Sequence, residues 1–193
     1  TKQIFMFDTQ AKAGAELRQI TNEQVDYNDL CVWGSAKTLM IIASRTDMIN
    51  PQDLYNVDVK AGTAKMITNV NEKLLAPIKK CTVAKRMVKT SDGKDMLVWV
   101  IYPPDFDANK KYPTLLYCQG GPQSVVSQFY SFRWNFSLMA SQGYIIVAPN
   151  RRGLPSFGEA WNDQITGDWG GQAMNDLTSA IDDVAKESYV DKN

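Results

Sequence analysis

The sequence TLLYCQGGPQS, residues 114–124, joins a short apolar run to a glycine-rich turn. Residues 114–118 are enough for one buried strand, and residues 119–122 then break the run. A second apolar run follows one helix length later, at residues 144–148. A buried strand, a turn, a crossover and another buried strand are typical of a parallel α/β sheet. Functional groups of such sheets lie at the carboxyl ends of the strands, which is where these glycines fall.

The composition is that of an ordinary globular protein with balanced charge. The 193 residues suffice for one large domain or parts of two, and 44% of them are hydrophobic. The 21 basic residues equal the 21 acidic ones, which argues against a nucleic-acid groove or an anionic-membrane patch. No apolar run is long enough for a membrane-spanning helix. The chain starts without Met or a signal-peptide pattern, so we expect an excerpt whose compartment its start does not reveal.

The chain contains no histidine. A Ser-His-Asp or Cys-His unit therefore cannot be completed within these residues. Cys31, Cys81 and Cys118 form no Cys-x-x-Cys pair, so we predict no metal site and expect all three thiols to be buried. The glycine turn does not fit G-x-G-x-x-G, and no G-x-x-x-x-G-K-[ST] string occurs, so no cofactor is predicted.

The first 76 residues contain an internal repeat of strand, turn and strand. The turn Lys12-Ala13-Gly14 recurs as Lys60-Ala61-Gly62, and the strand ending Ile-Thr-Asn at residues 20–22 recurs 47 residues later at residues 67–69. The strands predicted here lie at residues 2–8, 16–21, 30–34, 38–44, 54–59 and 66–69.

That period is near the roughly 40 to 50 residues of a four-stranded propeller blade. Residues 23–70 would then form one blade, and residues 1–22 the last two strands of the blade before it. We therefore expect residues 1–76 to be the last one and a half blades of a β-propeller, which needs neighbouring blades to bury its faces. An unrelated antiparallel meander with a chance match in its turns is the alternative.

The pattern changes near Pro77, and residues 77–193 indicate a second domain. Asp92-Gly93 between two strand-like runs predicts a hairpin. Phe132 and Phe136 recur at helical spacing and are expected in core or interface packing. The elements predicted in this part are strands at residues 81–90, 96–102, 114–118 and 144–148, a partly helical segment within residues 125–142, and a helix at residues 172–186.

The last predicted helix carries an apolar stripe. Met174, Leu177, Ile181 and Val184 share one side, which predicts that this side packs on the sheet. The acids Asp176, Asp182 and Asp183 are expected away from that stripe, and the adjacent pair in solvent, because neighbouring helical residues point to different faces.

The glycine turn allows a chemical interpretation and a structural one. In α/β-hydrolases a backbone N–H after the third strand donates to the oxyanion, and glycine lets the main chain approach a substrate carbonyl. A simple tight turn explains Gly120 and Gly121 equally well. Arg151 and Arg152 end the next strand and are suited to bind an anionic ligand, although we favour a structural role in which one of them ties the following loop to nearby acids or carbonyls.

Three stretches resemble the prolyl oligopeptidase family of serine peptidases: TSDGKDMLVWVIYPPDFDANKKYPTLLYCQGGPQS, YIIVAPNRRGLPSFGEAW and GDWGGQAMNDLTSAIDDV. The likeness covers nearly all of residues 81–193 and is strongest to the dipeptidyl-peptidase and acylaminoacyl-peptidase branch. The resemblance implies a mixed fold, in which β-propeller blades are followed by the first part of an α/β-hydrolase domain. It also implies hydrolysis of short peptides through an acyl-enzyme, with a G-x-S-x-G nucleophile elbow beyond Asn193 and the Asp and His later still.

The resemblance also implies roles for residues that are present. Gln119 stands where many relatives have His or Tyr, and a Tyr there donates its phenol to the oxyanion. Where the loop contains His-Gly-Gly-Pro, a glycine N–H donates instead, so Gly121 is the first candidate and Gly120 the next. Side-chain donation by Gln119 stays open. Arg152 matches the arginine of the family's Arg-Gly pair and is interpreted as structural.

The resemblance leaves several alternatives. The implied partners are a peptide substrate and the remainder of the same protein, with a homodimer left open. A periplasmic or secreted location is favoured, and a cytoplasmic location is left open. A non-catalytic, peptide-binding scaffold of the same folds is the first alternative, since every feature present is support and none is the triad. An esterase on the hydrolase fold is the second.

Overall fold

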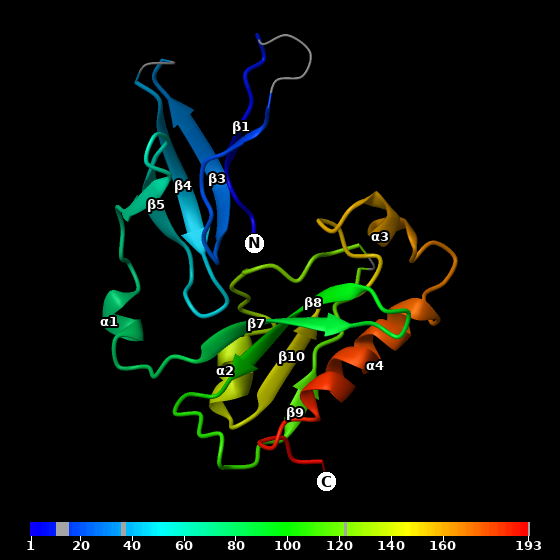
Figure 1. Cartoon of the computed structure of the whole chain (residues 1–193). Coiled ribbons are helices and arrows are strands. Elements are labelled where there is room, and N and C mark those ends of the chain that lie inside the picture. The colour runs from blue at the N-terminus through cyan, green and yellow to red at the C-terminus, as the bar shows by residue number, and fades with distance from the viewer. Residues whose placement is uncertain (11–15, 36–37, 122, 193) are drawn as a thin grey trace. The chain divides into compact units, whose positions relative to one another are not determined.

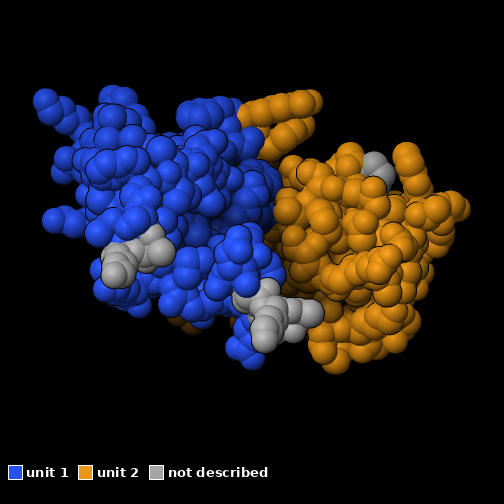
Figure 2. Space-filling model, turned by 90° about the horizontal axis from the view of Figure 1, so that it is seen from above, with its two compact units in different colours: residues 1–78, 127–132 blue, residues 79–126, 133–193 orange. Residues whose placement is uncertain are grey.

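A computed structural model describes residues 1–10, 16–35, 38–121 and 123–192. The chain divides into two compact units, which Figure 2 colours separately. Unit 1 comprises Thr1–Ile78 together with Ser127–Phe132, and unit 2 comprises Lys79–Val126 and the chain from Arg133 onward. The predicted turn at residues 12–14 and the Pro122 of the glycine turn lie outside the described residues. Strands predominate over helices in the described chain (Figure 1).

Unit 1 is built on a four-stranded antiparallel meander. The strands follow one another in the order β3-β4-β5-β6, so residues 23–70 do supply four consecutive strands, as predicted. The bounds in unit 1 are β1 (Phe5–Met6), β2 (Arg18–Gln19), β3 (Asp26–Trp33), β4 (Met40–Thr46), β5 (Asp53–Asp58), β6 (Thr63–Met66) and α1 (Glu72–Leu75). Strand β6 begins three residues earlier than predicted, and β1 pairs with β2 in a separate antiparallel ribbon.

The two parts of the sequence repeat contact each other in unit 1. The carboxylate of Asp58 accepts the backbone N–H groups of Lys60 and Ala61, at 2.8 and 2.9 Å, which shapes the turn after β5. Gly62 then has φ +69°, and a Cβ there would lie 2.5 Å from the carbonyl oxygen of Ile20. The turn of the second copy therefore packs against the Ile-Thr-Asn ending of the first, and this close approach requires glycine.

Unit 2 contains a mixed four-stranded sheet in the order β7-β8-β10-β9. Its strands are β7 (Thr82–Lys89), β8 (Asp95–Tyr102), β9 (Thr114–Leu116) and β10 (Ile145–Pro149). Strands β9 and β10 pair in parallel, whereas β8 runs antiparallel to both β7 and β10. The predicted hairpin and the predicted parallel pair are thus confirmed. Strand β9 is shorter than predicted, although the Tyr117 N–H still donates to the carbonyl of Val147 at 2.8 Å.

Helices pack on this sheet and complete its core. The helices of unit 2 are α2 (Phe136–Ser141), α3 (Glu159–Asp163) and α4 (Gln172–Val184). Helix α4 packs on β7 and β10, and α2 on β8 and β10 (Figure 1). Gly143, at φ +89°, follows α2 and donates its N–H to Ala140, which confirms that it ends the helix. Packing of these helices against the sheet removes apolar surface from water, which stabilises unit 2.

Three expectations about helix α4 need correction. Met174 is exposed, and the buried stripe is completed by the small residues Ala173 and Ala180. Asp176 is fully buried rather than on the solvent side, because it pairs with Arg152. Asp183 is not simply solvated either, since it accepts a hydrogen bond from Arg86 of β7 at 2.7 Å.

Two further expectations about burial were wrong. Phe136 is buried, but Phe132 is 88% exposed and lies four residues before it in a segment that is not helical. Among the cysteines only Cys81 is buried, and burial raises the pKa of its thiol, whereas Cys31 and Cys118 are exposed. Cys31 lies in the second half of β3, where consecutive residues on both faces are exposed, and Cys118 already lies beyond the end of β9. The expectation for Phe132 rested on helical spacing with Phe136, and the expectation for the cysteines rested on residue type.

Candidate functional site: the loop after β9

The glycine turn is an exposed loop that leaves the carboxyl end of β9. Gly121 has φ +74°, a left-handed conformation that favours glycine. Within the described residues, no hydrogen bond engages the N–H groups of Gly120 or Gly121. A Cβ at Gly120 would meet nothing within 4 Å, and one at Gly121 would meet only Ser124, at 3.9 Å. The two amides therefore have no hydrogen-bond partner among the described residues, and a side chain's worth of space lies open beside each Cα atom.

Arg151 fixes the beginning of this loop. It directly follows Asn150 at the end of β10, and its guanidinium donates to the backbone carbonyl of Gln119 at 3.0 Å and to that of Arg152 at 2.6 Å. The side chain is buried, and this burial lowers the pKa of the guanidinium. The indole N–H of Trp161 in turn donates to the Arg151 carbonyl at 3.0 Å. Arg151 is thus a structural clamp on the first residue of the loop.

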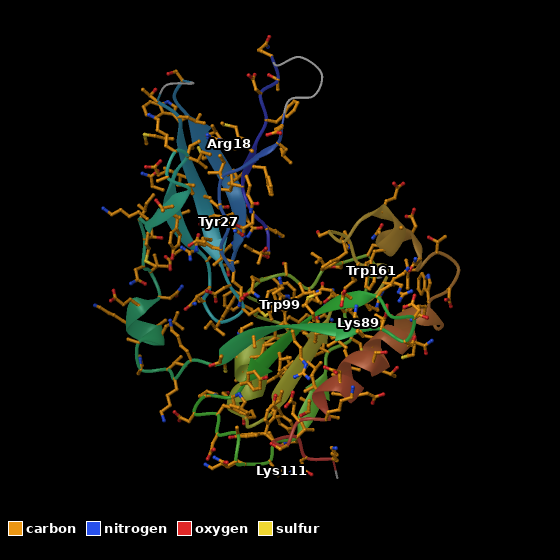
Figure 3. The ribbon with its side chains drawn as sticks, in the orientation of Figure 1. Arg18, Tyr27, Lys89, Trp99, Lys111 and Trp161 are labelled. Atoms are coloured by element: carbon orange, nitrogen blue, oxygen red, sulfur yellow. The ribbon has the colours of Figure 1, made fainter. Side chains whose placement is uncertain are left out.

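Asn150 fixes the end of the loop. This fully buried side chain makes two hydrogen bonds with the main chain of Val126: its Oδ1 accepts the N–H at 3.0 Å, and its Nδ2 donates to the carbonyl at 3.1 Å. The same carbonyl accepts the indole N–H of Trp99 at 2.9 Å, from strand β8 (Figure 3). Adjacent residues at the end of β10 therefore hold both ends of the loop.

The side chain of Gln119 is engaged within the loop. Its Oε1 accepts the hydroxyl of Tyr117 at 2.7 Å, and its Nε2 contacts the carbonyl of Gly120 at 3.3 Å. The ring of Tyr117 packs edge-on against Phe136 of α2, with centroids 4.9 Å apart. Burial raises the pKa of the Tyr117 phenol, so it stays a proton donor to Gln119 at neutral pH.

Arg152 has a structural role in unit 2. Its guanidinium lies between Asp92 of the β7–β8 turn and the buried Asp176 of α4, with hydrogen bonds of 2.7 and 3.1 Å, and it stacks on the ring of Trp161. Hydrogen bonding to Arg152 holds the pKa of the Asp92 carboxyl well below its usual range. The structural interpretation of Arg152 is therefore confirmed, and the acids that it ties come from the hairpin and the last helix.

A cavity of about 760 Å³ adjoins the loop within unit 2. Its lining includes the apolar residues Leu115 and Ile146 of the sheet, together with Gly120, Gly121 and Trp134. The cavity thus has both apolar side chains and glycines of the loop in its lining. In the described part of the chain no group of three His, Cys, Asp or Glu residues is placed to hold a metal ion, and no helix is long and apolar enough to span a membrane.

Two residues of this site were missed by the sequence analysis. Asn150 and Trp99 both act on Val126, seven residues after Gln119, and nothing in the local sequence links them to the glycine turn. An amide side chain directly after a fully apolar strand was the available signal, because a buried Asn must find hydrogen-bond partners. Of the predicted positions, Gln119, Gly120 and Gly121 lie together in the loop, and Arg151 but not Arg152 contacts it.

Comparison with known proteins gives consistent matches. Residues 130–193 match the model of the prolyl oligopeptidase family. Dipeptidyl-peptidase 5 of Porphyromonas endodontalis is 51% identical over 178 residues, which are 92% of this chain and 25% of that protein. The Porphyromonas gingivalis protein of the same name is 52% identical over 91% of this chain and 25% of its own length.

Solved structures share the fold. An acylaminoacyl peptidase in complex with Z-Gly-Gly-Phe-chloromethyl ketone superposes with a TM-score of 0.81 and 21% identity, over 98% of this chain and 28% of that one. The Pyrococcus horikoshii acylaminoacyl peptidase gives a TM-score of 0.78 and 22% identity, over 92% of this chain and 27% of that one. The chain spans about a quarter of the length of the curated relatives that it matches. It belongs to the prolyl oligopeptidase family of serine peptidases.

Proposed function

We propose that the protein containing this chain is a serine peptidase that hydrolyses short peptides, and that the loop after β9 supplies its oxyanion hole. The observation that carries the proposal is the pair of open amides at Gly120 and Gly121, held at the carboxyl end of a parallel strand. The relatives named dipeptidyl-peptidase 5 and acylaminoacyl peptidase support a substrate with a short peptide chain.

The proposed chemistry needs an N–H that points at the developing negative charge. When a serine attacks a peptide carbonyl, the oxygen becomes an oxyanion, and a fixed N–H stabilises it more than it stabilises the planar substrate. We assign this donation first to Gly121 and next to Gly120. The clamp from Arg151 and the two hydrogen bonds from Asn150 support the assignment, because a preorganised donor needs no rearrangement during the reaction.

Gln119 has a different proposed role. Its side-chain nitrogen already contacts the carbonyl of Gly120, and its oxygen accepts from Tyr117. We infer that Gln119 shapes the loop through these contacts, rather than donating a hydrogen bond to the substrate. The histidine base comes from another part of the protein, since this chain has no histidine, and we assign the nucleophile and the orienting acid to other parts as well.

We further propose that residues 1–76 are the last one and a half blades of a β-propeller and that residues 77–193 are the first part of an α/β-hydrolase domain. The four-stranded meander β3-β4-β5-β6 supports the first assignment. The order β7-β8-β10-β9, with a parallel pair ending in the glycine loop, supports the second. The substrate and the rest of the same protein are the proposed partners.

Labelling of the full-length protein with a fluorophosphonate probe tests the proposal. We expect covalent labelling of the folded protein that heat denaturation abolishes, together with cleavage of a chromogenic dipeptide amide. Absence of labelling of the folded protein would refute a serine peptidase and favour a binding scaffold. Labelling with turnover of simple esters, but with no cleavage of dipeptide amides, would instead indicate an esterase.

A further inference from the structure

Asp26 is a fully buried carboxylate at the start of β3, next to the labelled Tyr27 in Figure 3. Its Oδ1 accepts the backbone N–H of Lys2 at 2.8 Å and that of Gln128 at 3.1 Å. Its Oδ2 accepts the hydroxyl of Ser127. The amino group of Thr1 is farther away, 3.9 Å from Oδ1. Both carboxylate oxygens therefore have hydrogen-bond partners, and two of the three donors come from a segment about 100 residues later in the chain.

The segment that Asp26 binds continues directly from the glycine loop. Ser127 and Gln128 are both buried, and they belong to unit 1, whereas Val126 belongs to unit 2. The chain thus passes from one unit to the other at the peptide bond between Val126 and Ser127. Val126 is the residue that Asn150 and Trp99 hold at the end of the loop.

We propose that Asp26 is a positioning residue for the oxyanion loop: by binding Ser127 and Gln128, it sets the path by which the loop leaves its last anchor. The inference rests on the proposed function of that loop. A buried carboxylate is strongly unfavourable unless hydrogen bonds satisfy it, so Ser127 and Gln128 are restricted to the one position in which both donors reach Asp26. The two ends of the loop, at Gln119 and Val126, are then fixed, and so is the segment that follows the loop from Ser127 onward.

A charged group suits this task better than an apolar contact. Hydrogen bonds to a carboxylate are directional and about twice as strong as those between neutral groups. An apolar contact tolerates sliding, because the hydrophobic effect is not directional. The carboxylate therefore determines the register of Ser127 and Gln128, which continue directly from Val126 at the end of the loop.

The test is the kinetics of Asp26→Asn in the full-length protein. The asparagine keeps one acceptor for Lys2 and Gln128 but places an NH2 group where the hydroxyl of Ser127 now donates. We expect kcat for a dipeptide amide to fall about tenfold with KM within about twofold, because an oxyanion donor acts in the transition state and not in substrate binding. An unchanged kcat per labelled active site would overturn the proposal.

Two more variants separate positioning from general damage. Asp58→Asn is the matched control, because Asp58 also accepts two backbone N–H groups in unit 1, at the exposed turn after β5. It should leave kcat and KM unchanged. Ser127→Ala removes one donor without a new polar group, and its effect on kcat should not add to that of Asp26→Asn. Fully additive losses would contradict action through Ser127.

Hydrogen exchange provides a readout that does not depend on catalysis. In Asp26→Asn we expect faster exchange at the amides of residues 119–128, with no change in the strands β7 and β8. Protection that falls equally in both regions would show a merely structural effect and overturn the proposal. If the unaltered protein does not react with the fluorophosphonate, the proposed function is refuted. If the unaltered protein is active and the Asp26→Asn variant is equally active, only the positioning role is refuted.

Discussion

Two glycine turns in this chain have opposite relations to their surroundings. At Gly62 a Cβ would lie 2.5 Å from a backbone oxygen, so the absence of a side chain is used for packing. At Gly120 the same test finds open space, and at Gly121 the nearest atom is 3.9 Å away. The comparison contrasts a glycine whose missing side chain permits a close backbone contact with two glycines whose N–H groups make no hydrogen bond within the described residues.

Gly121→Ala should give the largest effect on activity and so test the open turn. The alanine must adopt φ +74°, which costs about 1–2 kcal/mol, and relaxation of this strain moves the N–H. We expect kcat to fall about 100-fold, near the loss for removing one oxyanion donor, with little change in KM. Steady-state kinetics of the full-length protein measures it. Full activity in the variant would remove Gly121 from the proposed oxyanion hole.

Gly62→Ala should give the largest effect on stability and so test the crowded turn. Both the positive φ and the contact with the Ile20 carbonyl oppose a Cβ, and we expect a loss of about 2–3 kcal/mol in the free energy of unfolding. Urea denaturation of the full-length protein measures it. The kcat of the folded fraction should not change, and a loss of kcat without a loss of stability would erase the contrast between the two turns.

Arg151→Met tests whether the open turn depends on its clamp. Methionine fills part of the buried space but cannot donate to the carbonyls of Gln119 and Arg152. We expect kcat to fall about tenfold because the first residue of the loop loses its anchor. Arg133→Met, at an arginine that lines the cavity, is the comparison and should affect KM more than kcat. Equal kcat for the unaltered protein and Arg151→Met would exclude the clamp.

The smallest effect concerns pH and the pair Asp92–Arg152. The Asp92 carboxyl has a pKa below its usual range because Arg152 donates to its charged form. A depressed pKa gives stability that is present above about pH 4 and is lost as the pH falls toward the lower value in the folded protein. We expect Asp92→Asn to lower Tm slightly at pH 7 and to differ less from the unaltered protein at pH 3. A difference that grows on acidification would contradict this.

Local patterns predicted most of the fold. The alternation and breaks of the sequence located the strands, and the Asp-Gly turn located the hairpin, because these signals act over a few residues. The errors concern long-range partners. Asp176 was expected away from the packed stripe of its helix, yet it is buried because Arg152, 24 residues earlier, reaches it.

The candidate site was only half predictable for the same reason. The glycines identified the loop, but its anchors are distant in sequence: Trp99 precedes Val126 by 27 residues, and Asn150 follows it by 24. No periodicity connects such positions. Asp26 is the extreme case, since its partners lie 101 and 102 residues later.

The two exposed cysteines make this chain convenient for spectroscopy. Cys31 belongs to unit 1 and Cys118 to unit 2, while Cys81 is buried and its thiol has a raised pKa. Maleimide dyes should therefore react first with Cys31 and Cys118, because thiolates in accessible positions are the reactive species. Cys118 directly precedes Gln119, so one fluorophore of the pair lies beside the loop after β9. Energy transfer between the two dyes would then report the distance between Cys31 and Cys118 in the full-length protein.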